Sequence, residues 1–120
     1  MEFCKKPILS IDYIISKTLT MKTTFIEEND RCVMCLEGRL DTNTSVQTER
    51  EMQVLNDYLS RDILLDCSSL EYISSSGLRL FLGLLKKVRA QGGHVGITGL
   101  SDNLLQVFDE IGFTQLFDIQ

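Results

Sequence analysis

The sequence predicts an α/β fold, a mixed β-sheet of four to five strands with three to four helices. Short apolar or alternating segments typical of strands occur along the chain, and in its second half they alternate with stretches that carry apolar residues at helical spacing. Two strands come first, followed by a helix and then by alternating strands and helices. This order favours a hairpin beside parallel strands, with helices on one or both faces of the sheet.

The first half of the domain is predicted to contain the hairpin and one helix. Strand-like segments at 23–27 and 31–37 are joined by a short polar turn. Asp41 or Thr42 is expected to cap the following helix, which should reach about Leu59. Its inward side chains are expected to be Val46, Leu55, Tyr58 and Leu59.

The second half is predicted to alternate strands and helices. Residues 63–66 form an apolar run ending in an acid, typical of a buried parallel strand. The next helix should begin at Gly77 and end at Gly92, and a strand at 94–98 should precede a last helix capped by Ser101. The expected core side chains of the two helices and the tail are Leu78, Phe81, Leu82, Leu85, Val88, Leu104, Leu105, Val107, Phe108, Ile111, Phe113, Leu116, Phe117 and Ile119.

Residues 66–76 are predicted to form a hydroxyl-rich loop between the strand and the helix. The first N–H groups of a helix have no partner within it, so serines at this point lie in a partly positive environment. Ser76 is the expected cap because it directly precedes the first helical residues. One or two hydroxyls suffice for a cap, which leaves a surplus among Ser74, Ser75 and Ser76. A purely structural role for Ser75 in the turn is the alternative.

Composition limits the classes of partner. The 120 residues fit one domain, and a net charge of −5 argues against binding to a nucleic-acid backbone. No apolar run approaches the roughly 20 residues that cross a bilayer, so no membrane insertion and a cytoplasmic location are expected. Residues 1–20 differ in character from the rest. We expect them to be a poorly ordered extension, and residues 21–120 to form the domain.

Cys32 and Cys35 form a C-x-x-C pair that could indicate metal or redox chemistry. They lie in a predicted strand, however, where positions three apart point to opposite faces. No second pair accompanies them, and His94 is the single histidine of the sequence. Buried cysteines without a metal or other cofactor are the favoured interpretation.

An enzyme would use Ser75 as nucleophile with His94 and Asp66 completing a triad. Ser75 follows the end of its strand, whereas His94 begins a strand expected to be parallel to it. The two residues should therefore lie near opposite edges of the sheet, far beyond the ~3 Å that a general base requires. The glycines do not form a phosphate-binding motif. We expect no enzymatic activity and no catalytic residue.

The segment from Asp66 to Leu78 resembles the signature loop of the STAS domain family, which includes the bacterial anti-sigma factor antagonists and relatives in sulfate transporters. Residues 38–41 and 94–101, and the pairs 107–108 and 112–113, are similar to further family stretches, and the resemblance covers about 21–118. It implies a STAS-like fold and a phosphorylation-controlled switch. The unphosphorylated antagonist sequesters an anti-sigma factor with a histidine-kinase-like ATPase fold, which frees a sigma factor. That anti-sigma factor acts as serine kinase, and a serine phosphatase reverses the modification.

The resemblance assigns the phosphorylated position to Ser75. Many antagonists carry an aspartate immediately before this serine, whereas this chain has Ser74. Because this chain lacks that aspartate, Ser74 and Ser76 stay alternative phosphorylation sites. A STAS adaptor subunit of a membrane transporter's cytoplasmic ATPase assembly, not switched by phosphorylation, is the alternative function.

The partner is expected to dock around the serine segment. Close approach to small hydroxyl side chains would let it cover Leu78 and its neighbours. Leu80 and Leu84 form a second i, i+4 pair that either joins this surface or packs beneath a neighbouring helix. The expected partner-binding residues are Asp41, Asp66, Ser74, Ser75, Ser76, Gly77, Leu78, Leu80 and Leu84.

Overall fold

A computed structural model describes residues 21–120, and they form a five-stranded mixed sheet in the order β1-β2-β3-β4-β5. β1 runs antiparallel to β2, and the other neighbours are parallel. This confirms the predicted α/β class with a hairpin beside parallel strands. The expectations for residues 1–20 lie outside the described residues. The strands are β1 (Met21–Glu28), β2 (Arg31–Leu40), β3 (Asp62–Ile73), β4 (His94–Thr98) and β5 (Asp118–Ile119).

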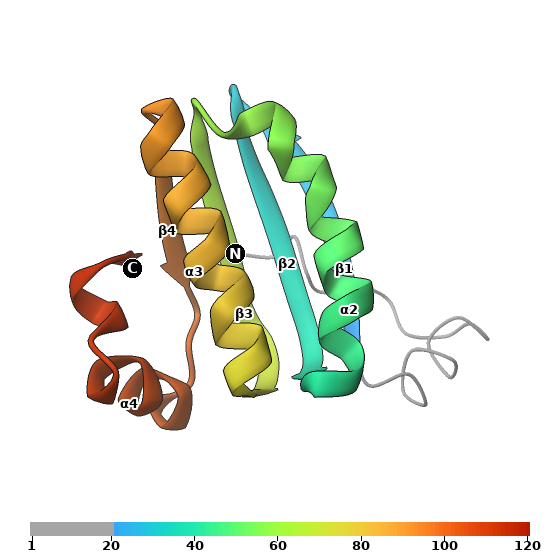
Figure 1. Cartoon of the computed structure of the whole chain (residues 1–120), viewed down its shortest axis with the longest axis vertical. Helices are drawn as coiled ribbons and strands as arrows, with labels where there is room; N and C mark the ends of the chain where they lie inside the picture. The colour runs from blue at the N-terminus through green and yellow to red at the C-terminus, as the bar shows by residue number, and fades with distance from the viewer. Residues whose placement is uncertain (1–20) are drawn as a thin grey trace.

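Figure 1 shows α2 and α3 lying side by side along one face of the sheet, with α4 beside its lower edge. No helix within residues 21–120 is long and apolar enough to span a membrane. The helices are α2 (Thr42–Glu51), the 3₁₀ helix η1 (Met52–Tyr58), α3 (Ser75–Gln91), α4 (Asp102–Glu110) and the 3₁₀ helix η2 (Phe113–Gln115).

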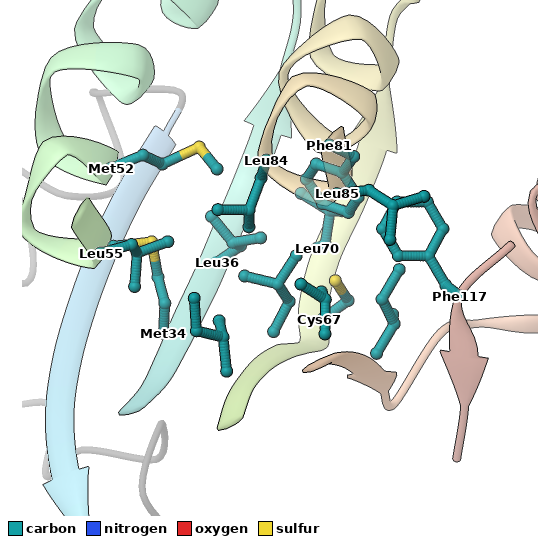
Figure 2. Packing of buried hydrophobic residues seen from close by; sticks show 14 of the residues in the cluster. Met34, Leu36, Met52, Leu55, Cys67, Leu70, Phe81, Leu84, Leu85 and Phe117 are labelled. Atoms are coloured by element: carbon teal, nitrogen blue, oxygen red, sulfur yellow. The ribbon is translucent and has the colours of Figure 1, made fainter. Parts of the chain in front are cut away.

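The main core lies between the helices and the sheet, and Figure 2 shows part of it. Phe81 and Phe108 are fully buried there and meet in a T-shaped arrangement, with ring centroids 5.9 Å apart. A smaller buried cluster on the other face of the sheet contains Val33, Cys35 and Leu64. Alternation along β2 therefore sends Cys32 and Cys35 to opposite faces, as predicted. Burial raises the pKa of the Cys32 thiol to about 12, so this thiol stays protonated at neutral pH.

β3 is longer than predicted, because it continues past Asp66 to Ile73. Its second half pairs with the end of β2 as far as Leu40, through two register shifts. Leu70 and Ile73 turn into the main core, so residues 67–73 are a bulged strand and not a loop. The expected loop between β3 and α3 shrinks to Ser74.

Several expected core positions are wrong. Val46 is 56% exposed, because α2 turns the smaller Ser45 and Thr48 toward the core, and the α-helix ends at Glu51 before continuing as η1. α4 buries only the narrow stripe of Leu104 and Phe108. The exposed side chains of α4 and the tail that we expected in the core are Leu105, Val107, Ile111 and Leu116.

Candidate functional site

The carboxyl ends of β2, β3 and β4 lie at one edge of the sheet, and each leads into the start of a helix (Figure 1). The caps are Asp41 for α2, Ser74 for α3 and Ser101 for α4. Helix starts carry unpaired N–H groups and the positive end of the helix dipole. This edge, which we call the serine edge, therefore favours nearby negative charge.

Ser74 joins β3 to α3 and is held by three hydrogen bonds. Its N–H donates to the carbonyl oxygen of Leu40 over 2.8 Å, and its hydroxyl oxygen accepts from the N–H of Gly77 over 3.3 Å. Its carbonyl oxygen accepts from the N–H of Leu78 over 2.9 Å. Ser74 is thus the cap, and the expectation that Ser76 caps α3 is wrong. The reason is that β3 runs to Ile73, so the helix begins two residues earlier than expected.

Ser75 is the first residue of α3, and its side chain is exposed. Ser76 follows and is partly buried. Of the three serines, only Ser74 uses its hydroxyl in a hydrogen bond among residues 21–120. The hydroxyl of Ser75 is therefore the most accessible of the three.

Gly77 determines how closely the first turn of α3 packs on the core. It is buried, and a Cβ there would lie 2.7 Å from the Cγ1 of Ile73 and 2.7 Å from the Cγ of Leu40. Such distances leave no room for a side chain, so a glycine lets the first turn of α3 sit directly on the ends of β2 and β3.

Asp41 lies beside Ser74 at the serine edge, because it follows Leu40 in the chain. Its carboxylate accepts from the Thr44 N–H over 2.9 Å, and the Thr44 hydroxyl oxygen accepts from the Asp41 N–H over 2.9 Å. The bond from the Thr44 N–H lowers the pKa of Asp41. Asp41 therefore caps α2 at the place where we expected a partner contact.

Two of the expected partner-binding residues lie inside the protein. Asp66 is 1% exposed, and its carboxylate accepts from the N–H and the hydroxyl of Ser68 over 3.0 and 2.7 Å. Leu84 is 6% exposed and points toward Met52 (Figure 2). Asp66 is not available to a docking protein, because it lies within β3. Leu84 is largely covered by α2 and η1 and keeps only a small part of its surface at the bottom of the groove beside α3. Leu78 and Leu80 are partly exposed and stay candidates.

The structure does not bring together Ser75, His94 and Asp66. Nδ1 of His94 lies 2.9 Å from a carboxylate oxygen of Asp62, and Nε2 lies 3.2 Å from a carboxylate oxygen of Asp118. It pairs with Asp62 at the start of β3, whereas Ser75 follows the end of that strand. The eleven steps along β3 from Asp62 to Ile73 span roughly 36 Å. A hydrolytic triad of these three residues cannot form.

The model of the STAS domain family matches residues 11–120. The chain belongs to the STAS domain family. This STAS domain is 31% identical over 99 residues to BtrV of Bordetella bronchiseptica, which is assigned as an anti-sigma factor antagonist; the match covers 82% of this chain and 85% of BtrV. It is 24% identical over 93 residues to the anti-sigma-B factor antagonist of Listeria monocytogenes, covering 78% of this chain and 82% of that protein.

Solved structures show the same fold. An anti-sigma factor antagonist from Mycobacterium paratuberculosis superimposes with a TM-score of 0.74 at 17% identity, covering 82% of this STAS domain chain and 84% of that one. The Bacillus protein SpoIIAA in its phosphorylated form gives a TM-score of 0.63 at 20% identity, covering 83% and 90%. At these identities the likeness establishes the STAS fold and nothing finer.

Sequence reasoning missed one pair of residues at the serine edge of this STAS domain. The Arg39 guanidinium carbon lies 4.4 Å from the centre of the Tyr72 ring, where the two residues pair at the ends of β2 and β3. Tyr72 is 39% exposed. An exposed aromatic ring beside an arginine is common in protein interfaces. The sequence does place Tyr72 two residues before Ser74. That position indicates a residue of the serine edge only when β3 is known to extend to Ile73.

Proposed function

We propose that this STAS domain is a cytoplasmic anti-sigma factor antagonist that switches by phosphorylation of Ser75. In its unmodified form it binds an anti-sigma factor that also acts as serine kinase, and so releases a sigma factor. A serine phosphatase restores the unmodified form. The observation that carries the proposal is the exposed hydroxyl of Ser75 on the first residue of α3, in a chain whose curated relatives are named antagonists.

Accessibility favours Ser75 over its neighbours as the phosphorylated residue. A kinase must bring its nucleotide to the hydroxyl oxygen, and the Ser75 side chain faces solvent. The Ser74 hydroxyl already accepts from Gly77, and Ser74 is held through its backbone to β2. Modifying Ser74 would remove the cap of α3, whereas modifying Ser75 would leave it in place.

The switch acts by exclusion of the partner. Phosphorylation adds a charge of about −1.5 to −2 at the serine edge. The start of α3 tolerates that charge, since the N–H groups of a helix start bind phosphate. The cost falls on the complex, where burying a charge without a partner cation can remove several kcal/mol, and about 1.4 kcal/mol is tenfold in affinity. The fold itself need not change, because the added charge acts on the complex and not on the packing within the domain.

The test is to incubate the purified protein with ATP and each anti-sigma factor kinase of its source organism, followed by mass spectrometry and affinity measurement. We expect one phosphate on Ser75, unchanged binding for Ser75→Ala and at least tenfold weaker binding for Ser75→Asp. Ser60→Asp is the matched control, because Ser60 is an exposed serine in the turn before β3, at the other end of the sheet. Equal binding by Ser75→Asp and the unmodified chain would disprove the exclusion mechanism. If Ser75 gained no phosphate from any of these kinases, the result would favour a STAS adaptor subunit that phosphorylation does not switch.

A further inference from the structure

A groove runs between α3 and the helical segment formed by α2 and η1, on the outer surface of the helical layer. Its volume is about 120 Å³. Met52 and Leu80 contribute apolar side chains to its lining, together with Leu84 at its base. Figure 2 shows Met52 and Leu84 approaching each other from the two sides. The groove therefore has an apolar floor that is open to solvent above.

Gly83 lines this groove in the middle of α3, and the fold gives no reason for a glycine there. A Cβ at Gly83 would meet no atom within 4 Å, and its backbone is ordinary helix. Glycine is the least favourable residue after proline in a helix interior. A glycine that packing does not require leaves space on the surface of α3, where another backbone or a bulky side chain can approach closely.

The rim of the groove carries unpaired charge. Arg79 and Lys87 stand on the α3 side, two turns apart, and Glu49 stands on the α2 side. Neither Arg79 nor Lys87 has an ion-pair partner among residues 21–120. A segment lying along α3 with carboxylates toward these two cations would be complementary in charge.

The groove is continuous with the serine edge. Arg79 follows Ser75 by four residues, so the two side chains lie one above the other on the same side of α3. Gly83 lies eight residues beyond Ser75, about 12 Å along the helix axis. A partner that covers Ser75 and follows α3 for two turns reaches the groove without leaving the surface.

We infer that the groove between α2–η1 and α3 is the second half of the docking surface for the anti-sigma factor. Its occupant is an amphipathic helix of that protein, with an apolar side chain over Gly83 and carboxylates near Arg79 and Lys87. This inference rests on the proposed function. It adds a second contact site for the partner, which does not involve Ser75.

Gly83→Leu tests the inference by filling the groove. The probe is the purified anti-sigma factor kinase that binds the unmodified chain, and the affinity is measured by calorimetry. We expect at least tenfold weaker binding with a melting temperature equal to or above that of the unmodified protein, because the new side chain enters open space. Ala90→Leu is the matched control: it adds a leucine to the exposed surface of α3 beyond the lining of the groove. It should bind like the unmodified chain.

Lys87→Glu provides a second test that does not fill the groove. We expect weaker binding at low salt, a smaller loss at high salt and an unchanged melting temperature. Unmodified protein that binds no anti-sigma factor would overturn the proposed function and this inference together. Normal binding by both folded variants would overturn the groove assignment alone. Altered self-association of Gly83→Leu with normal partner binding would assign the groove to a second copy of this chain and would also overturn it.

Discussion

The first turn of α3 is closed against the sheet, whereas one side of the same helix is open around Gly83. At the first turn, Ser74 is tied to β2 by a 2.8 Å hydrogen bond, and Gly77 has no room for a Cβ. In the middle, Gly83 would meet no atom within 4 Å if it gained one. The two glycines lie six residues apart on one helix, yet only Gly77 is required by packing, and a side chain would fit at Gly83.

This difference separates what the fold requires from what a partner could use. The close approach of Leu40 and Ile73 fully explains why residue 77 is a glycine. The same close packing determines the position of the Ser75 hydroxyl. Gly83 has no contact to explain it, so its cost to the helix calls for a reason outside the chain. A helix can thus be rigidly placed by its first turn and still keep one side of its middle available as surface.

Gly77→Ala should have the largest effect on stability. The new methyl group would overlap Ile73 and Leu40, and overpacking of this kind costs about 1–3 kcal/mol even though alanine is the better helix former. The measurement is urea denaturation followed by circular dichroism. A free energy of unfolding equal to that of the unmodified protein would show that the first turn of α3 is not closed as described.

Ser74→Ala should lower the free energy of unfolding by about 1 kcal/mol, the usual cost of losing a helix cap. The hydroxyl of Ser74 accepts from the Gly77 N–H, and no alanine can replace it. Ser76→Ala is the control, and its effect should stay within about 0.5 kcal/mol because Ser76 caps nothing. If Ser76→Ala were the more damaging of the two, the assignment of the cap would be wrong.

Gly83→Ala should raise the free energy of unfolding by up to about 1 kcal/mol, the difference between alanine and glycine inside a helix. Since the added methyl group enters open space, no packing cost opposes the gain. The measurement is again urea denaturation, and the midpoint of unfolding should shift to a higher urea concentration. Destabilisation by Gly83→Ala would show that the middle of α3 is as constrained as its first turn, and the contrast between the two glycines would fail.

Elements defined by local chemistry were predictable from the sequence. The hairpin, the cap of α4 by Ser101 and the glycine that ends α3 all follow from residues a few positions apart, and the structure has them. The end of β3 was not predictable in this way. Ser68 and Ser69 are typical of a loop, yet they continue the strand because the long β2 offers backbone partners as far as Leu40.

That one error accounts for most of the corrections at the site. A strand ending at Asp66 would leave its carboxylate in a loop, whereas the longer β3 keeps it inside the sheet, 1% exposed. The longer strand also moves the cap from Ser76 to Ser74. Leu84 differs, because its burial depends on how α2 and η1 cross α3, and spacing along a single helix does not reveal that.

Asp41→Asn should give the smallest effect, and one that depends on pH. The Thr44 N–H lowers the pKa of Asp41 below its ordinary value of 3.8. A carboxyl group with a lower pKa in the folded state stabilises the fold fully above the ordinary value, and this contribution is lost as the pH falls through the lowered pKa. Asparagine also caps helices but carries no titrating charge.

The comparison to make is therefore the urea stability of the unmodified chain and of Asp41→Asn, at neutral pH and again below the ordinary pKa of aspartate. The other carboxyl groups titrate in both proteins and cancel in the difference. We expect the unmodified chain to lose more stability than Asp41→Asn between the two conditions. Equal losses would mean that the start of α2 does not depend on the charge of its cap, and that the serine edge is held from the side of α3 alone.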